Sequence, residues 1–176
     1  GHSHIMAATV PNCVSYDPTY SYELAVIIQD GLRRMYVEQE DIFYYITVMN
    51  ENYSHPAMPK GIELDILKGM YSFRQAANNK APRVQLLGAG TIFRAELLHN
   101  DWGVEAGLWS CPSFTELARD GQSCERWNRL HPTEPARQSH VAGCLGNAVG
   151  PVIAATDYTR AFAEQIRGLI AAPYTV

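Results

Sequence analysis

The sequence predicts an α/β fold built on a three-layer, mostly parallel, doubly wound sheet. Three short runs rich in apolar and β-branched residues, at 42–49, 83–87 and 152–155, are typical of strands that are buried on both faces. Segments whose apolar residues recur at three- and four-residue spacing separate these runs and predict amphipathic helices. A glycine turn at 88–90 joins one such strand to the next helix. Strands that alternate with helices along a chain form parallel sheets.

The first elements lie before residue 50. Alternating apolar and polar residues at 10–16 predict a strand, and Asp17-Pro18 then predicts a helix cap followed by the first helical residue. The helix that follows is expected to be about five turns long. Its apolar stripe is Leu24, Ile27, Ile28, Leu32 and Met35. The run 42–49 is the next strand, and the polar, proline-broken stretch 53–61 is predicted to be a loop, where functional groups of α/β folds collect.

The middle of the chain continues the alternation of strands and helices. A strand is predicted at 83–87, followed by the glycine turn, a short helix and a strand at 105–111. Ser113 and Glu116 then form a capping box, so a helix is expected to begin there.

The last third of the chain contains two helices and one strand by the same reasoning. Gly121 is expected to break the helix that begins after Ser113, and a loop rich in proline, glycine and asparagine runs to about residue 150. A buried strand follows at 152–155. Asp157 is expected to cap the final helix, whose apolar stripe is Phe162, Ile166, Leu169 and Ile170.

Composition and charge exclude several classes of protein. At 176 residues, with 47% hydrophobic and 18% charged residues, the chain fits one globular domain of ordinary size. A net charge of −4 argues against a nucleic acid partner, since basic pairs such as Arg33-Arg34 are short and flanked by acids. No apolar run approaches the ~20 residues that span a bilayer, so no membrane partner is expected. The four widely spaced cysteines are expected to be reduced thiols in a cytoplasmic protein.

Two glycine motifs have ordinary explanations. The Gly-Ala-Gly turn at 88–90 is typical of dinucleotide-binding loops, but Phe93 stands where the third glycine belongs, so we interpret it as a plain strand-to-helix turn. The Asp-Gly pair at 120–121, with Asn147 downstream, resembles a pattern by which some enzymes hold magnesium and a diphosphate. Arg119 occupies the place of the first glycine of that pattern, so an ordinary helix break is the preferred interpretation.

Histidines supply the candidate functional groups. His131 and His140 lie in the proline-rich loop with no nucleophile or acid at a recognisable spacing, so surface or capping roles are expected. His2 and His4 stand in the string Gly-His-Ser-His at 1–4, which is either a remnant of a purification tag or part of an active-site loop. No serine stands in a Gly-x-Ser-x-Gly elbow, so Ser/His/Asp nucleophilic catalysis has no support.

Longer strings, in order along nearly the whole chain, carry a resemblance to a known family. They are Gly-His-Ser-His at 1–4, Pro-Asn-Cys-Val-Ser-Tyr-Asp-Pro-Thr-Tyr at 11–20, Tyr-Tyr-Ile-Thr at 44–47, Asn-Glu-Asn-Tyr at 50–53, Pro-Ala-Met-Pro at 56–59, Phe-Thr-Glu-Leu-Ala-Arg-Asp-Gly at 114–121, Cys-Glu-Arg-Trp-Asn at 124–128, Leu-His-Pro at 130–132 and Ala-Thr-Asp-Tyr at 155–158. With these strings the chain resembles the decarboxylating component of the homodimeric bacterial pyruvate dehydrogenase complex.

The resemblance implies a function and a set of partners. Members of that family use thiamine diphosphate and Mg²⁺ to decarboxylate pyruvate, and they pass the acetyl unit to a lipoyl group of the acyltransferase component. The implied partners are therefore pyruvate, a second copy of the chain in a homodimer, and the lipoyl acyltransferase component. The resemblance covers the tail of the pyrimidine-binding middle domain at 1–50 and a transketolase-type C-terminal domain at 51–176, truncated before its end.

The resemblance also implies roles for individual residues. It makes 1–4 a native loop in which His4, and with it His2, is expected to be catalytic. An imidazole titrates near neutrality, so it can donate to a substrate carbonyl or stabilise developing charge. Glu51 and Asn52 match the place where related transketolases present an arginine to a substrate phosphate, and they are expected to line the substrate channel. No residue of the chain is expected to bind cofactor or metal, because the family's ligands for both would lie upstream.

Two features limit the resemblance. The helix after Gly90 is several residues short, with Arg94 running directly into Ala95, and the chain stops at Val176 before the family's last strand. We therefore expect the 176 residues to be a fragment that is inactive by itself. The alternatives are a non-catalytic oligomerisation or interaction domain, a related transketolase, and a different 2-oxo acid dehydrogenase.

Overall fold

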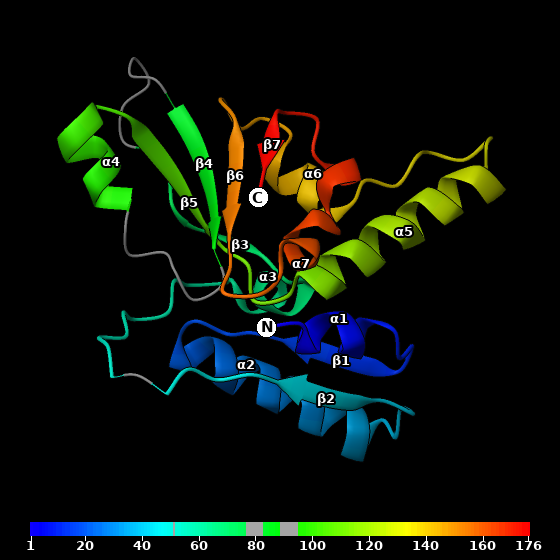
Figure 1. The fold of residues 1–176 in the computed structure, drawn as a ribbon. Coiled ribbons are helices and arrows are strands. Elements are labelled where there is room, and N and C mark those ends of the chain that lie inside the picture. The colour runs from blue at the N-terminus through cyan, green and yellow to red at the C-terminus, as the bar shows by residue number, and fades with distance from the viewer. Residues whose placement is uncertain (51, 77–82, 89–94) are drawn as a thin grey trace.

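The chain folds into two units that lie against each other. The structure is a computed structural model and describes residues 1–50, 52–76, 83–88 and 95–176. Its strands form a two-stranded and a five-stranded sheet, which Figure 1 shows below and above the junction. The predicted α/β class with a mostly parallel sheet is confirmed. The run 42–49 nevertheless contributes to the small sheet, and not to the sheet that contains 83–87 and 152–155.

The smaller unit is a β-α-β unit preceded by a short helix. Helix α1 (Ser3–Ala8) leads into strand β1 (Cys13–Tyr16), which pairs in parallel with β2 (Phe43–Ile46). Helix α2 (Ser21–Leu32) connects the strands and continues into a π-helical turn, η1 (Arg33–Val37). The sequence predicts that β2 is covered on both faces, but its residues are exposed or half-buried. Strand β1 is its only strand partner in the described chain, so β2 is an edge strand there.

Helix α2 begins later than the sequence predicts. The Asp-Pro pair at 17–18 is not its cap, because the N-cap residue is Tyr20. The Glu23 carboxylate accepts the backbone N–H of Thr19 at 2.6 Å and that of Tyr20 at 3.0 Å. Glu23 is the N3 residue of a capping box, so its side chain reaches back to the backbone N–H of the N-cap residue. The Asp17 side chain instead accepts the Thr47 hydroxyl at 2.6 Å.

The larger unit contains the five-stranded sheet, whose strand order is β3-β5-β4-β6-β7. Strand β3 runs antiparallel to β5, and the other pairs are parallel. Sequence reasoning misses β3, although its four residues, Tyr-Ser-Phe-Arg, alternate between aromatic and polar side chains. The strands are β3 (Tyr71–Arg74), β4 (Arg83–Gly88), β5 (Glu105–Ser110), β6 (Val152–Ala155) and β7 (Tyr174–Thr175).

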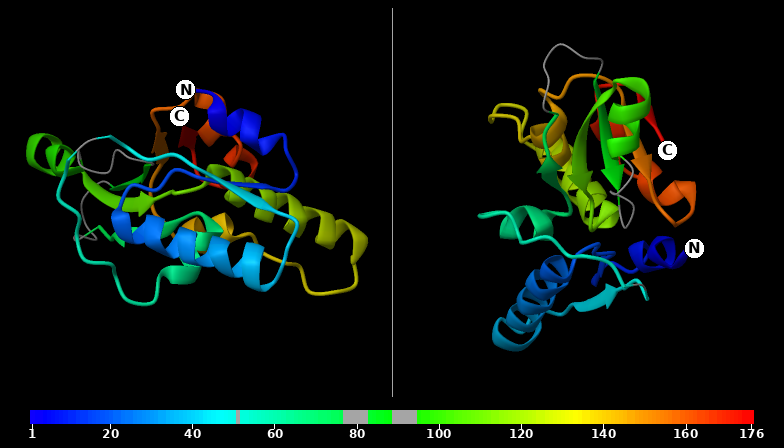
Figure 2. Two further views of the ribbon diagram at one scale, coloured as in Figure 1. Left: turned by 90° about the horizontal axis from the view of Figure 1, so that it is seen from below. Right: turned by 90° about the vertical axis from the view of Figure 1, so that its left-hand side faces the viewer.

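The helices of the larger unit flank its sheet or lie at the junction with the smaller unit. They are α3 (Glu63–Lys68), α4 (Ala95–Trp102), α5 (Phe114–Leu130), α6 (His140–Leu145), α7 (Arg160–Glu164) and the 3₁₀ turn η3 (Arg167–Leu169). Helix α3 packs at the junction, with Ile66 in one cluster with Val14 and Ile27 of the smaller unit. Figure 2 shows from two further directions that the smaller unit lies at one end of the sheet. Within the described residues, none of these helices combines the length and the apolar composition needed to cross a membrane.

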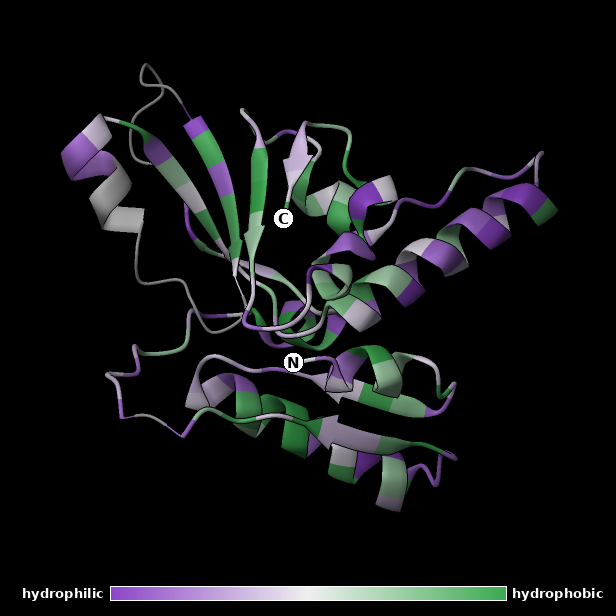
Figure 3. Ribbon diagram, in the orientation of Figure 1, coloured by the Kyte–Doolittle hydropathy of each residue, from purple (hydrophilic) through white to green (hydrophobic). Residues whose placement is uncertain are grey.

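The main core lies between one face of the large sheet and helices α5, α6 and α7. Its fully buried residues include Phe114 and Leu117 from α5 and Phe162 from α7, packed against Leu87 of the sheet. A second cluster joins the other face of the sheet to the smaller unit through Tyr20. The outer half of α5 extends away from this core and is mainly hydrophilic in Figure 3.

Two local predictions about helix ends are wrong. Gly121 does not break α5, which runs through it without interruption. An added Cβ at Gly121 would overlap the Leu169 side chain, so a larger residue there would require Leu169 to move. Asp157 does not cap the last helix, since the N-cap residue of α7 is Thr159 and Asp157 is exposed.

The two loop histidines behave differently from each other. His131 has the capping role that the sequence allows: it ends α5, and its ring stacks on Trp127 with centroids 3.6 Å apart. His140 is not a surface residue, because it begins α6 with a side chain only 11% exposed. Its Nε2 lies 2.8 Å from the Met70 carbonyl oxygen, so the ring ties α6 to the segment before β3.

Side chains at the start of α5 hold the backbone of β1 across the junction. The Ser113 hydroxyl donates to the Ser15 carbonyl at 2.6 Å, in a buried hydrogen bond. The Arg119 guanidinium donates to the carbonyls of Cys13 at 2.8 Å and Val10 at 3.0 Å. The two units therefore share one hydrogen-bonded interface.

Candidate functional site

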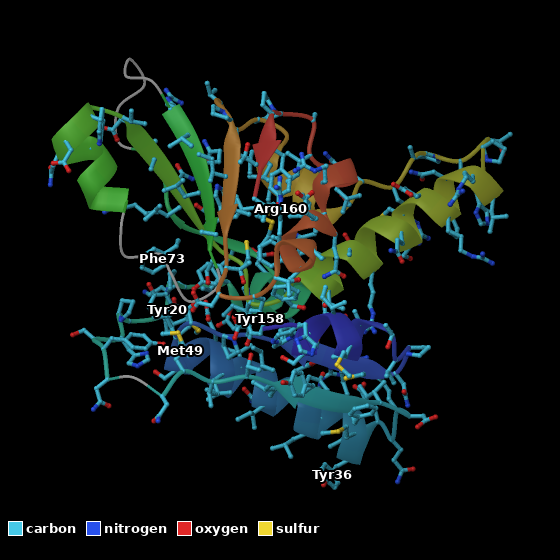
Figure 4. All side chains as sticks on the ribbon, viewed as in Figure 1. Tyr20, Tyr36, Met49, Phe73, Tyr158 and Arg160 are labelled. Atoms are coloured by element: carbon cyan, nitrogen blue, oxygen red, sulfur yellow. The ribbon has the colours of Figure 1, made fainter. Side chains whose placement is uncertain are left out.

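The ends of strands from both units meet at the junction. Asp17 directly follows β1, Thr47 directly follows β2, and Tyr158 lies shortly after β6. The Thr47 hydroxyl donates to Asp17 Oδ1 at 2.6 Å, and the Tyr158 hydroxyl donates to the same oxygen at 3.3 Å. Figure 4 shows Tyr158 at this junction. Because α/β folds bind ligands beyond the carboxyl ends of their parallel strands, this cluster is the candidate functional site.

His4 joins the cluster from helix α1. Its side chain is 0% exposed, and its Nε2 lies 2.9 Å from Thr47 Oγ1. Three aromatic rings enclose the imidazole, with centroid distances of 4.7 Å to Tyr158, 4.9 Å to Phe162 and 5.3 Å to Tyr45. The other ring nitrogen, Nδ1, is also buried and has no hydrogen-bond partner in the described part of the chain.

Burial sets the charge of the cluster. It lowers the pKa of His4 to about 4, because the aromatic enclosure keeps water from the protonated ring. The premise that this imidazole titrates near neutrality is therefore wrong, and His4 is neutral at pH 7. Burial also raises the pKa of Asp17, and the hydrogen bonds from Thr47 and Tyr158 oppose that shift.

The other predicted site residues lie apart from His4. His2 is exposed, and its backbone carbonyl accepts the N–H groups of Ile5 at 3.1 Å and Met6 at 3.2 Å at the start of α1. Asn52 is exposed, and Glu51 lies outside the described residues. The structure thus places one histidine of the Gly-His-Ser-His string inside the junction and the other on the surface.

A small hollow lies beside the loop that contains Asn52. Its volume is about 120 Å³, and its lining includes Tyr20, Met49 and His55. Figure 4 shows Tyr20 and Met49 close to each other at this place. His55 closes one side, since its Nδ1 accepts the backbone N–H of Ser21 at 3.1 Å. The hollow therefore lies between the end of β2 and the start of α2, next to the predicted substrate channel.

Glu23 forms a second polar cluster at the junction. Its carboxylate is 0% exposed and accepts four hydrogen bonds. Two come from the backbone N–H groups of Thr19 and Tyr20, and two come from the larger unit, from the Tyr71 and Ser110 hydroxyls at 2.6 Å each. This carboxylate therefore caps α2 and fastens it to β3 and β5.

Sequence reasoning misses Asp17, Thr47 and Tyr158 as site residues. Their common signal is position: each follows a strand of a parallel pair, where polar side chains collect. The signal is lost when Asp17 is assigned as a helix cap, because a local explanation then accounts for the residue.

Comparisons with known proteins define the class to which this fold and site belong. Residues 1–56 match the family of the pyruvate dehydrogenase E1 component middle domain, and residues 69–174 match the transketolase-like C-terminal domain. The second match covers more than half of the chain, so the chain belongs to the transketolase-like C-terminal domain family.

Curated relatives narrow this class. The chain is similar along its whole length to the pyruvate dehydrogenase E1 component of Cupriavidus necator, with 66% identity over 100% of this chain and 20% of the relative. It is 61% identical to that of Pseudomonas aeruginosa over 95% of this chain, and 53% identical to that of Escherichia coli K12 over 98%. The resemblance drawn from the sequence is confirmed. The chain spans about a fifth of the length of these relatives, 20% in each case.

Solved structures share the fold at low sequence identity. Transketolase from Campylobacter jejuni superposes with a TM-score of 0.60 at 13% identity, over 99% of this chain and 23% of that one. Transketolase from Pichia stipitis, in complex with sedoheptulose 7-phosphate, gives 0.57 at 15% identity, over 99% and 21%. At these identities the likeness shows the fold alone.

Proposed function

We propose that the full-length protein containing this chain is the thiamine diphosphate-dependent component that decarboxylates pyruvate and transfers the acetyl unit to the lipoyl group of an acyltransferase. The observation that carries the proposal is the 66% identity, over the whole chain, to a pyruvate dehydrogenase E1 component. The two family matches follow each other along the chain, which supports the same proposal. The activity is assigned to the full-length protein because the chain is 20% of such a relative.

The chain would contribute one wall of the reaction site. We assign catalytic roles to His4 and His2 and a place in the substrate channel to Glu51 and Asn52. The closeness of His4 to the strand ends of both units supports its assignment. We divide the chain into a middle-domain tail at 1–50 and a C-terminal domain at 51–176.

The cofactors would be thiamine diphosphate and Mg²⁺. No group of three His, Cys, Asp or Glu side chains in the described ranges could hold a metal ion, so these residues do not fit the metal. We therefore place the ligands of Mg²⁺ and of the diphosphate in other parts of the full-length protein. The further partners are a second copy of the protein and the lipoyl acyltransferase, and the compartment is the cytoplasm.

Decarboxylation assays on the full-length protein test this function. Carbon dioxide release is measured from pyruvate and from 2-oxoglutarate, with thiamine diphosphate, Mg²⁺ and either an artificial electron acceptor or a lipoylated domain. We expect release from pyruvate and transfer of acetyl to the lipoyl group. Preference for 2-oxoglutarate, or two-carbon transfer between sugar phosphates, would assign a related enzyme instead. No turnover of any of these substrates would favour the oligomerisation or interaction domain.

A further inference from the structure

The hydroxyl group of Thr47 determines where the proton of His4 lies. It lies 2.6 Å from Asp17 Oδ1, 3.4 Å from the Tyr16 carbonyl oxygen and 2.9 Å from His4 Nε2, and the Tyr158 hydroxyl is a fourth neighbour. The carboxylate and the carbonyl can only accept, and a hydroxyl has a single hydrogen to give. Because the distance to Asp17 is the shortest, the hydroxyl hydrogen points to that carboxylate in a donated hydrogen bond. Thr47 Oγ1 must then accept from the imidazole. His4 therefore carries its hydrogen on Nε2.

The second ring nitrogen is then left with a lone pair. A neutral imidazole has one N–H, so Nδ1 of His4 is an acceptor. It is buried, and no hydrogen-bond donor of the described chain reaches it. A buried polar atom without a partner is destabilising, so this nitrogen favours a ligand that brings a donor. The lowered pKa of His4, about 4, agrees with a ring that carries a single proton.

We propose that Asp17 and Thr47 are positioning residues for His4: they hold the neutral ring with its hydrogen on Nε2 and leave Nδ1 to accept a hydrogen bond from an O–H group of the bound reactants. The inference rests on the proposed function, in which such reactants bind at the junction. It assigns His4 the role of an acceptor and not of an acid. Tyr158 supports Asp17 from the larger unit by donating to the same carboxylate oxygen.

Access to Nδ1 depends on the segment that covers the ring. The backbone N–H of Thr159 donates to the Gly1 carbonyl at 2.7 Å, and a Cβ on Gly1 would lie 2.9 Å from the Tyr158 ring. Gly1 therefore lies against Tyr158, which is one of the three rings around His4. Because Nδ1 is buried, a reactant must displace part of this enclosure to reach it.

A reversed arrangement of donors is the alternative. It needs a protonated Asp17 that donates to Thr47, which then donates to His4 and leaves the ring hydrogen on Nδ1. That proton would have to lie on Asp17 Oδ1, the oxygen toward which the Tyr158 hydroxyl also points. A hydroxyl that donates to a carboxyl oxygen favours the ionised carboxylate, so the Tyr158 hydroxyl favours the first arrangement.

Nitrogen NMR on the full-length protein separates the two arrangements without any assay of activity. The protein is labelled with ¹⁵N-histidine, and solid-state spectra of the wild type and of His4→Gln are compared at pH 7. The signals that disappear in the variant belong to His4. We expect them to show a neutral ring protonated on Nε2. Signals of a ring protonated on Nδ1, or of an imidazolium, would overturn the proposal.

Kinetics test whether this arrangement matters to the reaction. Thr47→Val keeps the shape of the side chain and removes the hydroxyl, and Thr47→Ser restores it. Loss of the outer-shell partner of a metal-bound histidine typically lowers activity about 10- to 100-fold. Thr47 stands in the same relation to His4, so we expect Thr47→Val to lower kcat by a factor of that size with little change in KM. Thr47→Ser should recover most of it, and Asp17→Asn should resemble Thr47→Val.

A second buried threonine provides the matched control. The Thr115 hydroxyl is buried and has no hydrogen-bond partner in the described chain, so Thr115→Val should keep kcat within about twofold. Equal losses in Thr47→Val, Thr47→Ser and Thr115→Val would refute a positioning role. If the wild type does not turn over pyruvate, the proposed function fails, and the NMR result alone decides the state of His4.

Discussion

Replacing Glu23 with leucine should open the junction between the two units. The carboxylate is fully buried and accepts from the amides of Thr19 and Tyr20 and from the hydroxyls of Tyr71 and Ser110. Leucine is similar in size but cannot accept a hydrogen bond. The directions of the two amides are fixed by the backbone, whereas a hydroxyl can rotate, so only the amides are counted in the expected loss. An unsatisfied buried donor costs about 1–3 kcal/mol, so the two amides together predict a loss of about 2–6 kcal/mol.

Amide hydrogen exchange of the full-length protein measures this loss locally. Exchange of the peptide that contains Thr19 and Tyr20 should accelerate in Glu23→Leu, because the free energy of local opening falls. Glu23→Gln is the matched variant: its oxygen can accept both amides, and its NH₂ can donate to the Tyr71 and Ser110 hydroxyls. We expect less than half of the leucine effect.

A surface replacement checks for effects of hydrophobicity alone. Glu125→Leu, at an exposed position of α5, should change stability by about 0.5 kcal/mol or less. The reasoning fails if Glu23→Leu exchanges like the wild type, or if Glu23→Leu and Glu23→Gln accelerate exchange equally. Either result would mean that the amides do not depend on this carboxylate.

Three further outcomes are expected in the full-length protein. Between pH 6.5 and about 4 the unfolded chain binds a proton at His4 that the folded chain does not, so stability should fall with falling pH by about 3 kcal/mol. The raised pKa of Asp17 acts in the opposite direction, so thermal melts of His4→Gln against wild type isolate the His4 share, which the variant should lack. His4→Ala should lower pyruvate turnover about 10²- to 10⁴-fold and leave cofactor affinity nearly unchanged. Equal losses in turnover and in cofactor affinity measured by calorimetry would contradict this. Gly69→Ala should lower the free energy of unfolding by at least about 1–3 kcal/mol, and with it the melting temperature, because Gly69 has φ 103° and an added Cβ would overlap the Ser113 carbonyl. An unchanged melting temperature would argue against that backbone conformation.

The sequence predicts three of the five strands of the large sheet, because each is a short run of mainly apolar residues. Strand β6 is buried on one face only, contrary to the prediction that both its faces are covered. Strands β4, β5 and β6 lie within one residue of the predicted runs. Errors occur where a local signal has a distant explanation. Gly121 is a helix breaker by propensity, yet here it makes room for Leu169, a residue 48 positions later in the printed sequence.

The candidate site is less predictable, because its properties also depend on residues that are distant in the sequence. The resemblance singles out His4, but its neutrality follows from three aromatic rings that come from β2, from the segment after β6 and from α7. Asp17 and Thr47 are 30 residues apart, and their hydrogen bond exists only because β1 and β2 pair in parallel. No spacing rule in a single sequence contains that pairing.

The hydrogen bonds between α5 and β1 determine which substitutions each side tolerates. On the β1 side the acceptors are main-chain carbonyls of Ser15 and Cys13, which every amino acid possesses. On the α5 side the donors are the side chains of Ser113 and Arg119, which few replacements can imitate. A saturation scan should therefore find that residues 13 and 15 accept any side chain of suitable volume, whereas positions 113 and 119 accept almost none. This part of the junction is specified by the α5 side, so substitutions in the strand do not require a compensating change in the helix.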